Sequence, residues 1–263
     1  MGRPLKLAIC LIASVLFCLS AAAQSSQSLP QVNPGRPTVS TPATLTPVGY
    51  LQFETGGIGA LDSPQVSTYE GINEVTKLTL APRLQFLAAF SPFAHYSAEG
   101  STGNSASGIS LGAQAVVKKG EGTSPTIAAS YFRQVYGGSA PDLDTGSATN
   151  SALLLASADV KSFHYDANAL FNEMTDSRVR RAQYGQTLSI SHHVAGKLSA
   201  SGEIWHFTQP FLRSHAVGNL WALSYNARNT LVFDAGFDRG LTHTSTQWEA
   251  FAGFTYLLPH RLW

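Results

Sequence analysis

Apolar and polar residues alternate with a period of two along most of the chain after residue 47, and the 3.6-residue period of an amphipathic helix is nearly absent. Segments of about 8–12 residues alternate or run apolar, with Gly, Pro, Asn, Asp and Ser between them. This pattern predicts an all-β protein. The twelve predicted strands are 48–56, 72–81, 83–90, 108–118, 125–136, 150–160, 162–173, 182–194, 197–207, 219–227, 229–238 and 247–258.

The lengths of the connections between these segments alternate. Tight or short connections at 82, 119–124, 161, 195–196 and 228 are interleaved with longer ones at 57–71, 91–107, 137–149, 173–181, 208–218 and 239–246. Outer-membrane barrels have an even strand number, short periplasmic turns, longer external loops and both termini in the periplasm. The alternation therefore predicts a transmembrane antiparallel up-and-down β-barrel of about 12 strands over residues 48–263.

The two faces of the predicted strands fit a wall between lipid and water. In segment 162–173, small and aromatic residues occupy one face, and polar residues other than Leu170 occupy the other. Small residues such as Ala167 and Ala169 would leave a sandwich core underfilled, whereas lipid fills its own gaps. Aromatic residues near strand ends suggest two interfacial girdles, namely Tyr50, Phe90, Phe171, Tyr184, Phe207, Tyr225, Phe237 and Trp248.

The polar face would line the lumen, and carboxylates dominate it. One hypothesis is a water-filled, mildly cation-tolerant pore. The alternative is a hydrogen-bonded network that braces the wall or closes the pore. The predicted pore-lining residues are Glu54, Gln114, His164, Asp166, Asn168, Glu203, Asp234 and Glu249.

The first 47 residues differ in composition from the rest. Basic residues, a 12-residue apolar run over 8–19 and three alanines predict a secretory signal peptide over 1–23, with Sec-type export. Cys10 and Cys18 both lie in this segment, so the mature chain is expected to contain no cysteine. Residues 24–47 are rich in Pro, Ser and Thr and predict an extended periplasmic linker without a core of its own.

Charge and candidate chemistry argue against several functions. The formal charge is +1, and removal of the signal peptide leaves 15 basic against 16 acidic residues, which does not suggest nucleic-acid binding. The histidines are scattered, and neighbouring His192 and His193 point to opposite faces of a strand, so neither a metal site nor a cofactor is expected. Ser189, Ser191 and His193 share a face and loosely suggest a membrane lipase. However, they fall at the predicted periplasmic end, so we predict that the protein is not an enzyme.

Four stretches carry a resemblance to a known family. GRPTVSTPATLTPVGYLQFETG (35–56) leads into the first strand, and INEVTKLTLAPRLQFLAAF (72–90) forms a tight hairpin. LVFDAGFDRGL (231–241) and FAGFTYLLP (251–259) close the chain. Together they resemble the outer-membrane transporter-like barrels named after the meta-cleavage pathway of phenol degradation. The resemblance implies a porin-like barrel through which small molecules pass, and it transfers no binding residue.

The predicted function is an outer-membrane channel or transporter for passive passage of small molecules, with hydrophobic or aromatic compounds as candidates. The rivals are a structural or surface-interaction barrel without transport, a lipid-modifying enzyme and a soluble periplasmic β-domain. The expected location is the outer membrane of a Gram-negative envelope, with outer-membrane lipids as partners.

The C-terminus carries a further prediction. Barrel-assembly machinery would recognise the last strand through the terminal Trp263. Because Pro259 cannot donate to a ladder, strand pairing is expected to end by Leu258, with HRLW folding along the periplasmic rim.

Overall fold

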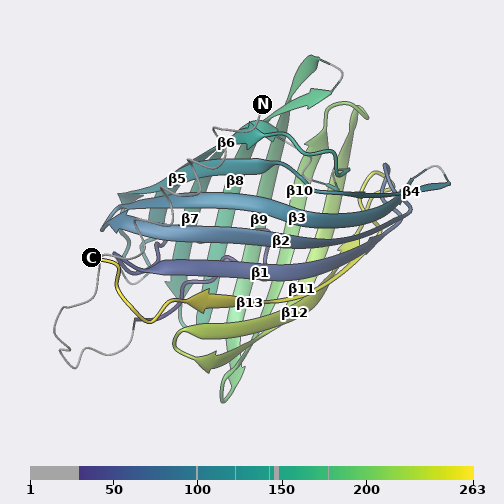
Figure 1. Cartoon of the computed structure of the whole chain (residues 1–263). Helices are drawn as coiled ribbons and strands as arrows, with labels where there is room; N and C mark the ends of the chain where they lie inside the picture. The colour runs from purple at the N-terminus through teal and green to yellow at the C-terminus, as the bar shows by residue number, and fades with distance from the viewer. Residues whose placement is uncertain (1–29, 99, 122, 142, 145–147, 177) are drawn as a thin grey trace.

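The computed structural model describes residues 30–98, 100–121, 123–141, 143–144, 148–176 and 178–263 (Figure 1). No helix in this part of the chain is long and apolar enough to cross a membrane. The predicted signal peptide and residues 24–29 lie outside the described residues. The strands are β1 Leu51–Leu61, β2 Thr68–Ala81, β3 Leu84–Ala98, β4 Ser101–Ser105, β5 Ile109–Lys118, β6 Thr126–Tyr136, β7 Ala148–Val160, β8 Phe163–Asp176, β9 Val179–Ala195, β10 Leu198–Gln209, β11 Ser214–Arg228, β12 Leu231–Gly240 and β13 Trp248–Leu257.

Twelve of these strands form a closed antiparallel barrel, as the alternation predicts. Each strand pairs with its neighbours in chain order, and β1 closes the ring by pairing with β13 from Gln52↔Leu257 to Leu61↔Trp248. The short strand β4 stands apart from the ring, because it pairs only with the far end of β3. All the polar backbone groups of the ring can therefore be satisfied between neighbouring strands, as a membrane-spanning sheet requires.

The barrel has one end with short turns and one end with longer loops. Two-residue turns at 82–83, 161–162, 196–197 and 229–230 lie at the end that holds the start of β1 and the end of β13, called the turn end. Longer connections such as 62–67, 137–147 and 241–247 lie at the opposite, loop end.

Two of the predicted long connections are wrong. The 173–181 loop shrinks to residues 177–178 between β8 and β9, and the 208–218 loop shrinks to residues 210–213 between β10 and β11. The strands continue there through segments such as 173–176 and 214–218, where apolar and polar residues no longer alternate regularly. The period-two signal therefore disappears before the ladder ends.

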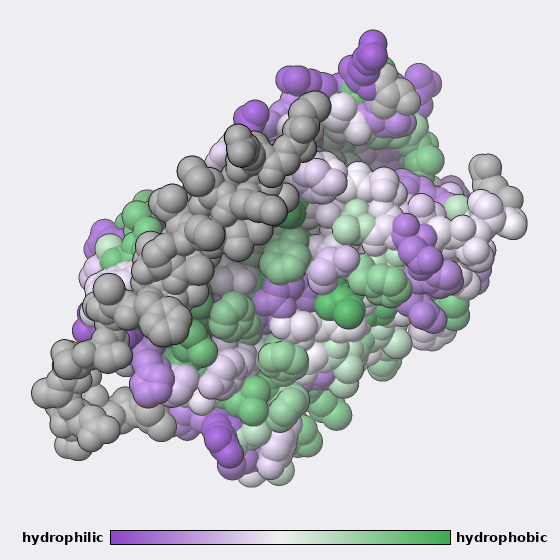
Figure 2. Space-filling view, viewed as in Figure 1, coloured by the Kyte–Doolittle hydropathy of each residue, from purple (hydrophilic) through white to green (hydrophobic). Residues whose placement is uncertain are grey.

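The outer face of the wall is apolar along its middle. Figure 2 shows hydrophobic residues over the strand faces and hydrophilic residues more often toward the ends. Phe171 and Tyr184 stack edge-on on this surface, and Trp248 lies beside Phe237. Phe207, expected in a girdle, lies instead inside the barrel. Its ring occupies the space that a side chain at Gly185 would fill.

Leu154 tests whether this face contacts lipid. It lies at the centre of β7, between Ala129 and Ala169 of the neighbouring strands, and is 56% exposed. We expect Leu154→Arg to lower the free energy of unfolding in lipid vesicles by about 2–4 kcal/mol, because arginine is costly at the bilayer midplane. Urea unfolding followed by tryptophan fluorescence would measure this. Leu241→Arg is the matched control, since Leu241 is equally exposed but lies in the β12–β13 connection; equal losses in both variants would contradict a lipid-facing wall.

The C-terminus confirms the predicted end of pairing. The β13 ladder ends at Leu257, and the Leu258 amide makes one last hydrogen bond to the Leu51 carbonyl, 2.9 Å away. After Pro259 the chain turns across the turn end, where the Leu262 amide donates to the Gly49 carbonyl at 2.8 Å. Gly49 has φ +84°, and a side chain there would collide with Arg261. Recognition of Trp263 by assembly machinery remains a prediction.

Candidate functional site

The predicted pore-lining residues point into the barrel, and most of them are buried. Glu54, Gln114, Asp166, Asn168, Glu203 and Asp234 are all buried. His164 lies half-exposed at the turn end, with its ring nitrogens 2.7 Å from Asp159 and 3.2 Å from Asp166. Glu249 lies near the loop end, close to Asp144 and Asp238. A water-filled pore would leave these groups solvated, so their burial requires another occupant of the lumen.

That occupant is the N-terminal segment, residues 30–49, which we call the strap. It enters at the turn end, where the Val32 amide donates to the Asn229 carbonyl at 2.8 Å. The Asn33 amide then donates to Gln52, and the Gly35 amide donates to Glu54, both at 2.9 Å. Residues 24–47 were expected to be an extended periplasmic linker without a core of its own. The described part of this range, residues 30–47, lies instead inside the barrel, because the polar wall supplies the hydrogen-bond partners that the strap cannot find within itself.

The middle of the strap crosses the lumen at Glu203. This carboxylate accepts hydrogen bonds from the Val39 and Ser40 amides, both at 2.7 Å, and from the Ser40 hydroxyl at 2.6 Å. The Ser40 hydroxyl also lies 2.7 Å from the Thr187 hydroxyl. Charge-assisted bonds of this kind are about twice as strong as neutral ones. Glu203 on β10 is therefore the main attachment of the strap to the far wall.

The strap then returns along β8, β7, β5 and β3. The Asn168 side chain bonds both the amide and the carbonyl of Thr41, at 2.6 and 2.9 Å. Gln114 donates to the Pro42 carbonyl at 3.0 Å. Ser157 accepts from the Ala43 amide at 2.7 Å and donates to Asp166. Gln85 accepts from the Thr46 amide at 3.0 Å. All six buried residues of the predicted set thus contact the strap, five directly and Asp166 through Ser157.

Two wall glycines make room for one strap side chain. The Arg36 guanidinium bonds Asp234 through Nε and Nη2, at 3.2 and 2.8 Å. A Cβ atom at Gly56 would lie 2.2–2.5 Å from three guanidinium atoms, and one at Gly253 would lie 2.8 Å from two of them. Arg36 therefore occupies a recess in the wall, here called the Arg36 seat, which larger residues at positions 56 and 253 would fill. Sequence reasoning missed this seat, although both glycines fall on the inward-facing side of their strands and could have indicated it.

Ion pairs neutralise the turn half of the lumen but not the loop half. Asp234 pairs with Arg36, and Glu54 pairs with Lys77 at 2.5 Å, with three of these four side chains at most 5% exposed. Nearer the loop end, Asp144, Asp238 and Glu249 lie close together. Burial raises the pKa of the Asp144 carboxyl above its usual value, while hydrogen bonds from Thr246 partly oppose this.

The described residues of the 137–147 loop, 137–141 and 143–144, fold across the loop end. Ala140 and Leu143 pack on a buried cluster formed by Ala60, Val66, Tyr69 and Ala94. On the other side, the Asp144 carbonyl accepts hydrogen bonds from Gln183 at 3.3 Å and Gln209 at 2.9 Å. The loop therefore narrows the loop end, while the strap closes the turn half.

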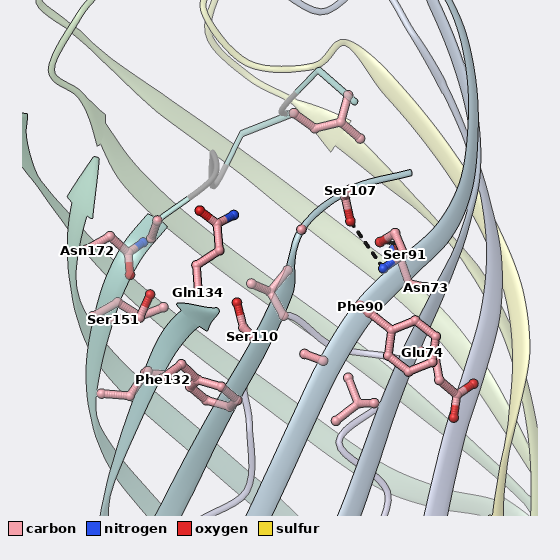
Figure 3. Close-up of a pocket in the computed structure, with 18 of the residues that line it drawn as sticks. Asn73, Glu74, Phe90, Ser91, Ser107, Ser110, Phe132, Gln134, Ser151 and Asn172 are labelled. Atoms are coloured by element: carbon pink, nitrogen blue, oxygen red, sulfur yellow. Dashed lines mark hydrogen bonds between the residues drawn. The ribbon is translucent and has the colours of Figure 1, made fainter. Parts of the chain in front are cut away.

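A cavity of about 580 Å³ remains between the strap and this loop (Figure 3). Its side wall carries Ser110, Gln134, Ser151 and Asn172, from strands β5 to β8. Its floor is apolar and is formed by Leu153 and Leu170 with Val39 of the strap. Leu170, the exception in its strand pattern, packs with Val39 against Trp205, Phe207 and Ala216.

The residues considered for hydrolysis do not form a catalytic pair. His193 bonds the Gly196 carbonyl at 2.9 Å. Within the part of the chain that the structure describes, neither Ser189 nor Ser191 hydrogen-bonds His193, and Ser189 is buried in the wall. The same part contains no group of three His, Cys, Asp or Glu side chains arranged to hold a metal ion.

Solved structures with the same fold are outer-membrane channels. The COG4313 outer membrane channel from Pseudomonas putida F1 has a TM-score of 0.58 at 14% identity, over 87% of this chain and 100% of the other. The NanC porin gives 0.53 at 8% identity, over 78% and 98% of the two chains. The KdgM porin in complex with disordered oligogalacturonate gives 0.52 at 12% identity, over 79% and 98%. The sequence matches no protein-family model and no curated protein. The fold is therefore that of outer-membrane channels.

Proposed function

We propose that this protein is an outer-membrane channel for passive passage of small molecules, gated by its own N-terminal strap. The observation that carries the proposal is a closed twelve-stranded barrel whose lumen is filled by a removable segment rather than by wall side chains. A barrel of this width leaves space inside. The strap contacts the wall through hydrogen bonds, one ion pair and three small packing clusters, and water can replace its hydrogen bonds.

The interactions that hold the strap in the lumen are of a kind that can break. Hydrogen bonds contribute about 0.5–1.5 kcal/mol each when water can replace them. Seven strap amides donate to wall side chains, and the buried apolar contacts of the strap involve Val32, Val39 and Ala43. The strap lacks ladder pairing with the wall in the described residues. It can therefore leave the lumen without unfolding the barrel.

The finer assignments are also proposals. The apolar outer face and the fold support insertion in the bacterial outer membrane, with the turn end in the periplasm. The likeness of the fold to outer-membrane channels supports a role other than catalysis. Membership in the family named after the meta-cleavage pathway of phenol degradation rests on sequence resemblance alone.

A disulfide between strap and wall would test the gate. Ser40 and Thr187 place their hydroxyl oxygens 2.7 Å apart, a separation that suits two cysteines. We expect oxidised Ser40→Cys/Thr187→Cys to reduce solute flux in liposome swelling about tenfold relative to the same protein after reduction, because the strap can no longer leave. The mature chain is expected to contain no other cysteine.

The single-cysteine variants are the controls and should respond to neither oxidant nor reductant. Flux that is unchanged by the disulfide would exclude the strap as the gate. A wild-type barrel that passes no solute, together with a strap-free barrel that conducts no ions, would instead favour a structural barrel without transport.

A further inference from the structure

The cavity above the strap carries little charge among the residues that the structure describes, although unpaired carboxylates gather near the loop end. Glu74 is the one charged residue among the described residues that line it. That carboxylate accepts a hydrogen bond from the Thr55 hydroxyl on the neighbouring strand, and in Figure 3 it points away from the other labelled side chains. Asp144, Asp238, Glu203 and Glu249 are absent from the lining. Apart from Glu74, the described residues that line this space would therefore offer a solute neither an anion nor a cation.

One wall of the cavity offers hydrogen-bonding groups that the protein leaves unused. In the described part of the chain, the side chains of Ser110, Gln134 and Ser151 make no hydrogen bond. Asn172 donates to Gln183 at 2.9 Å, which leaves its carbonyl oxygen available. Strand pairing places Ser110 opposite Gln134, and Ser151 opposite Asn172, so these groups lie on adjacent strands. Together they supply both donors and acceptors.

The floor of the cavity is apolar and includes the gate. Leu153 and Leu170 pair across β7 and β8, one step closer to the turn end than Ser151 and Asn172. Val39 of the strap completes this floor. A solute resting there covers apolar surface below while its edge reaches the amide and hydroxyl groups on the wall.

We propose that this cavity binds a compact uncharged solute with an apolar face and a hydrogen-bonding edge, of the chemical class of an aromatic amide. The proposal rests on the proposed function and identifies this cavity as the solute site of that channel. An ionised solute would lose hydration and find no countercharge, which is costly. A polyol would leave the apolar floor uncovered. Because Val39 belongs to the strap, an occupied cavity touches the gate directly.

Binding of matched probes to the full-length protein in detergent tests this assignment. Benzamide and benzoate have nearly the same shape and differ in charge, benzylamine supplies a cation, and glucose is neutral without an aromatic face. We expect saturable binding of benzamide in equilibrium dialysis, corrected for empty micelles. Benzoate, benzylamine and glucose should bind at least about tenfold more weakly.

A substitution in the cavity wall localises the site. Gln134→Leu should weaken benzamide binding about five- to tenfold. Leucine is similar in size to glutamine but cannot hydrogen-bond the solute. Ser151→Ala should have a smaller effect in the same direction. Gln186→Leu makes the same change on the outer face of β9, where Gln186 is exposed, and should leave binding unchanged. Heat-modifiable migration on a gel would verify that each variant has folded.

Equal affinity for benzamide and benzoate, or unchanged binding in Gln134→Leu, would overturn the assignment. These outcomes are separate from failure of the channel function. Ion conductance of the strap-free barrel tests the channel whether or not benzamide binds. Conductance without selective binding would reject only the solute class, whereas selective binding without conductance would reject only the channel.

Discussion

Deletion of residues 30–47 should raise the single-channel conductance of the barrel in planar bilayers about tenfold or more over the wild-type protein. The deletion removes the segment that occupies the turn half of the lumen, from Arg36 on Asp234 to Thr46 on Gln85. In the deletion variant, water solvates the wall groups that the strap covers in the wild-type protein. The deletion therefore leaves no charged group buried without a partner. The barrel ladder contains none of these residues and should persist.

The described residues of the 137–147 loop set an upper limit to this effect. They still lie across the loop end, held through Asp144 by Gln183 and Gln209. Conductance of the deletion variant should therefore remain below that of a fully empty barrel. A variant in which residues 30–47 are replaced by a Gly/Ser segment of equal length is the control. It should conduct like the deletion, because such a segment has no Arg36 or Val39 with which to dock.

A deletion variant that conducts no better than the wild type would place the closure elsewhere, at the 137–147 loop. A Gly/Ser variant that stays closed would show that any chain of this length blocks the lumen. In that case the specific contacts at Glu203 and Asn168 would not set the gate. Both results can be read only if the variants show the heat-modifiable migration of a folded barrel.

The wall of the barrel could be predicted from sequence because its physical signal is local. Each strand must place apolar residues toward lipid at every second position, as Phe163, Tyr165 and Phe171 do in β8. Turn residues separate such runs. The signal fails where apolar and polar residues stop alternating, which is why the loop-end extensions of β9 and β11 were missed. It also cannot place Phe207, because an aromatic residue packs as well against an inward glycine as against lipid.

The content of the lumen could not be predicted in the same way. The strap has no period, and five prolines between residues 30 and 47 are typical of a linker. Its structure comes from partners that are distant in sequence, such as Glu203 for Ser40 and Asp234 for Arg36. The carboxylates of Glu54, Glu203 and Asp234 lie buried on the inner side of the wall. Their role as attachment points for the strap depends on the tertiary contact, although a bracing or closing network was one of the two alternatives.

A single methyl group on the wall should displace the strap. We expect Gly56→Ala to raise conductance several-fold and to speed hydrogen exchange at the Val39 and Ser40 amides about tenfold. The added Cβ would lie 2.2–2.5 Å from three atoms of the Arg36 guanidinium, well inside contact distance. Arg36 must then leave Asp234, whose side chain is 1% exposed. Loss of a buried charge partner costs about 3–5 kcal/mol unless water enters, so the solvated, open lumen is favoured.

Gly59→Ala on the same strand is the matched control, because a Cβ at that position meets no atom within 4 Å. It should leave conductance and exchange at wild-type values. Arg36→Ala should open the channel by itself, and Gly56→Ala added to it should change conductance little, since the collision partner is already gone. Additive effects of the two substitutions would show that Gly56 acts through the wall rather than through Arg36. A closed Gly56→Ala channel with protected Val39 and Ser40 amides would show that the strap does not depend on this seat.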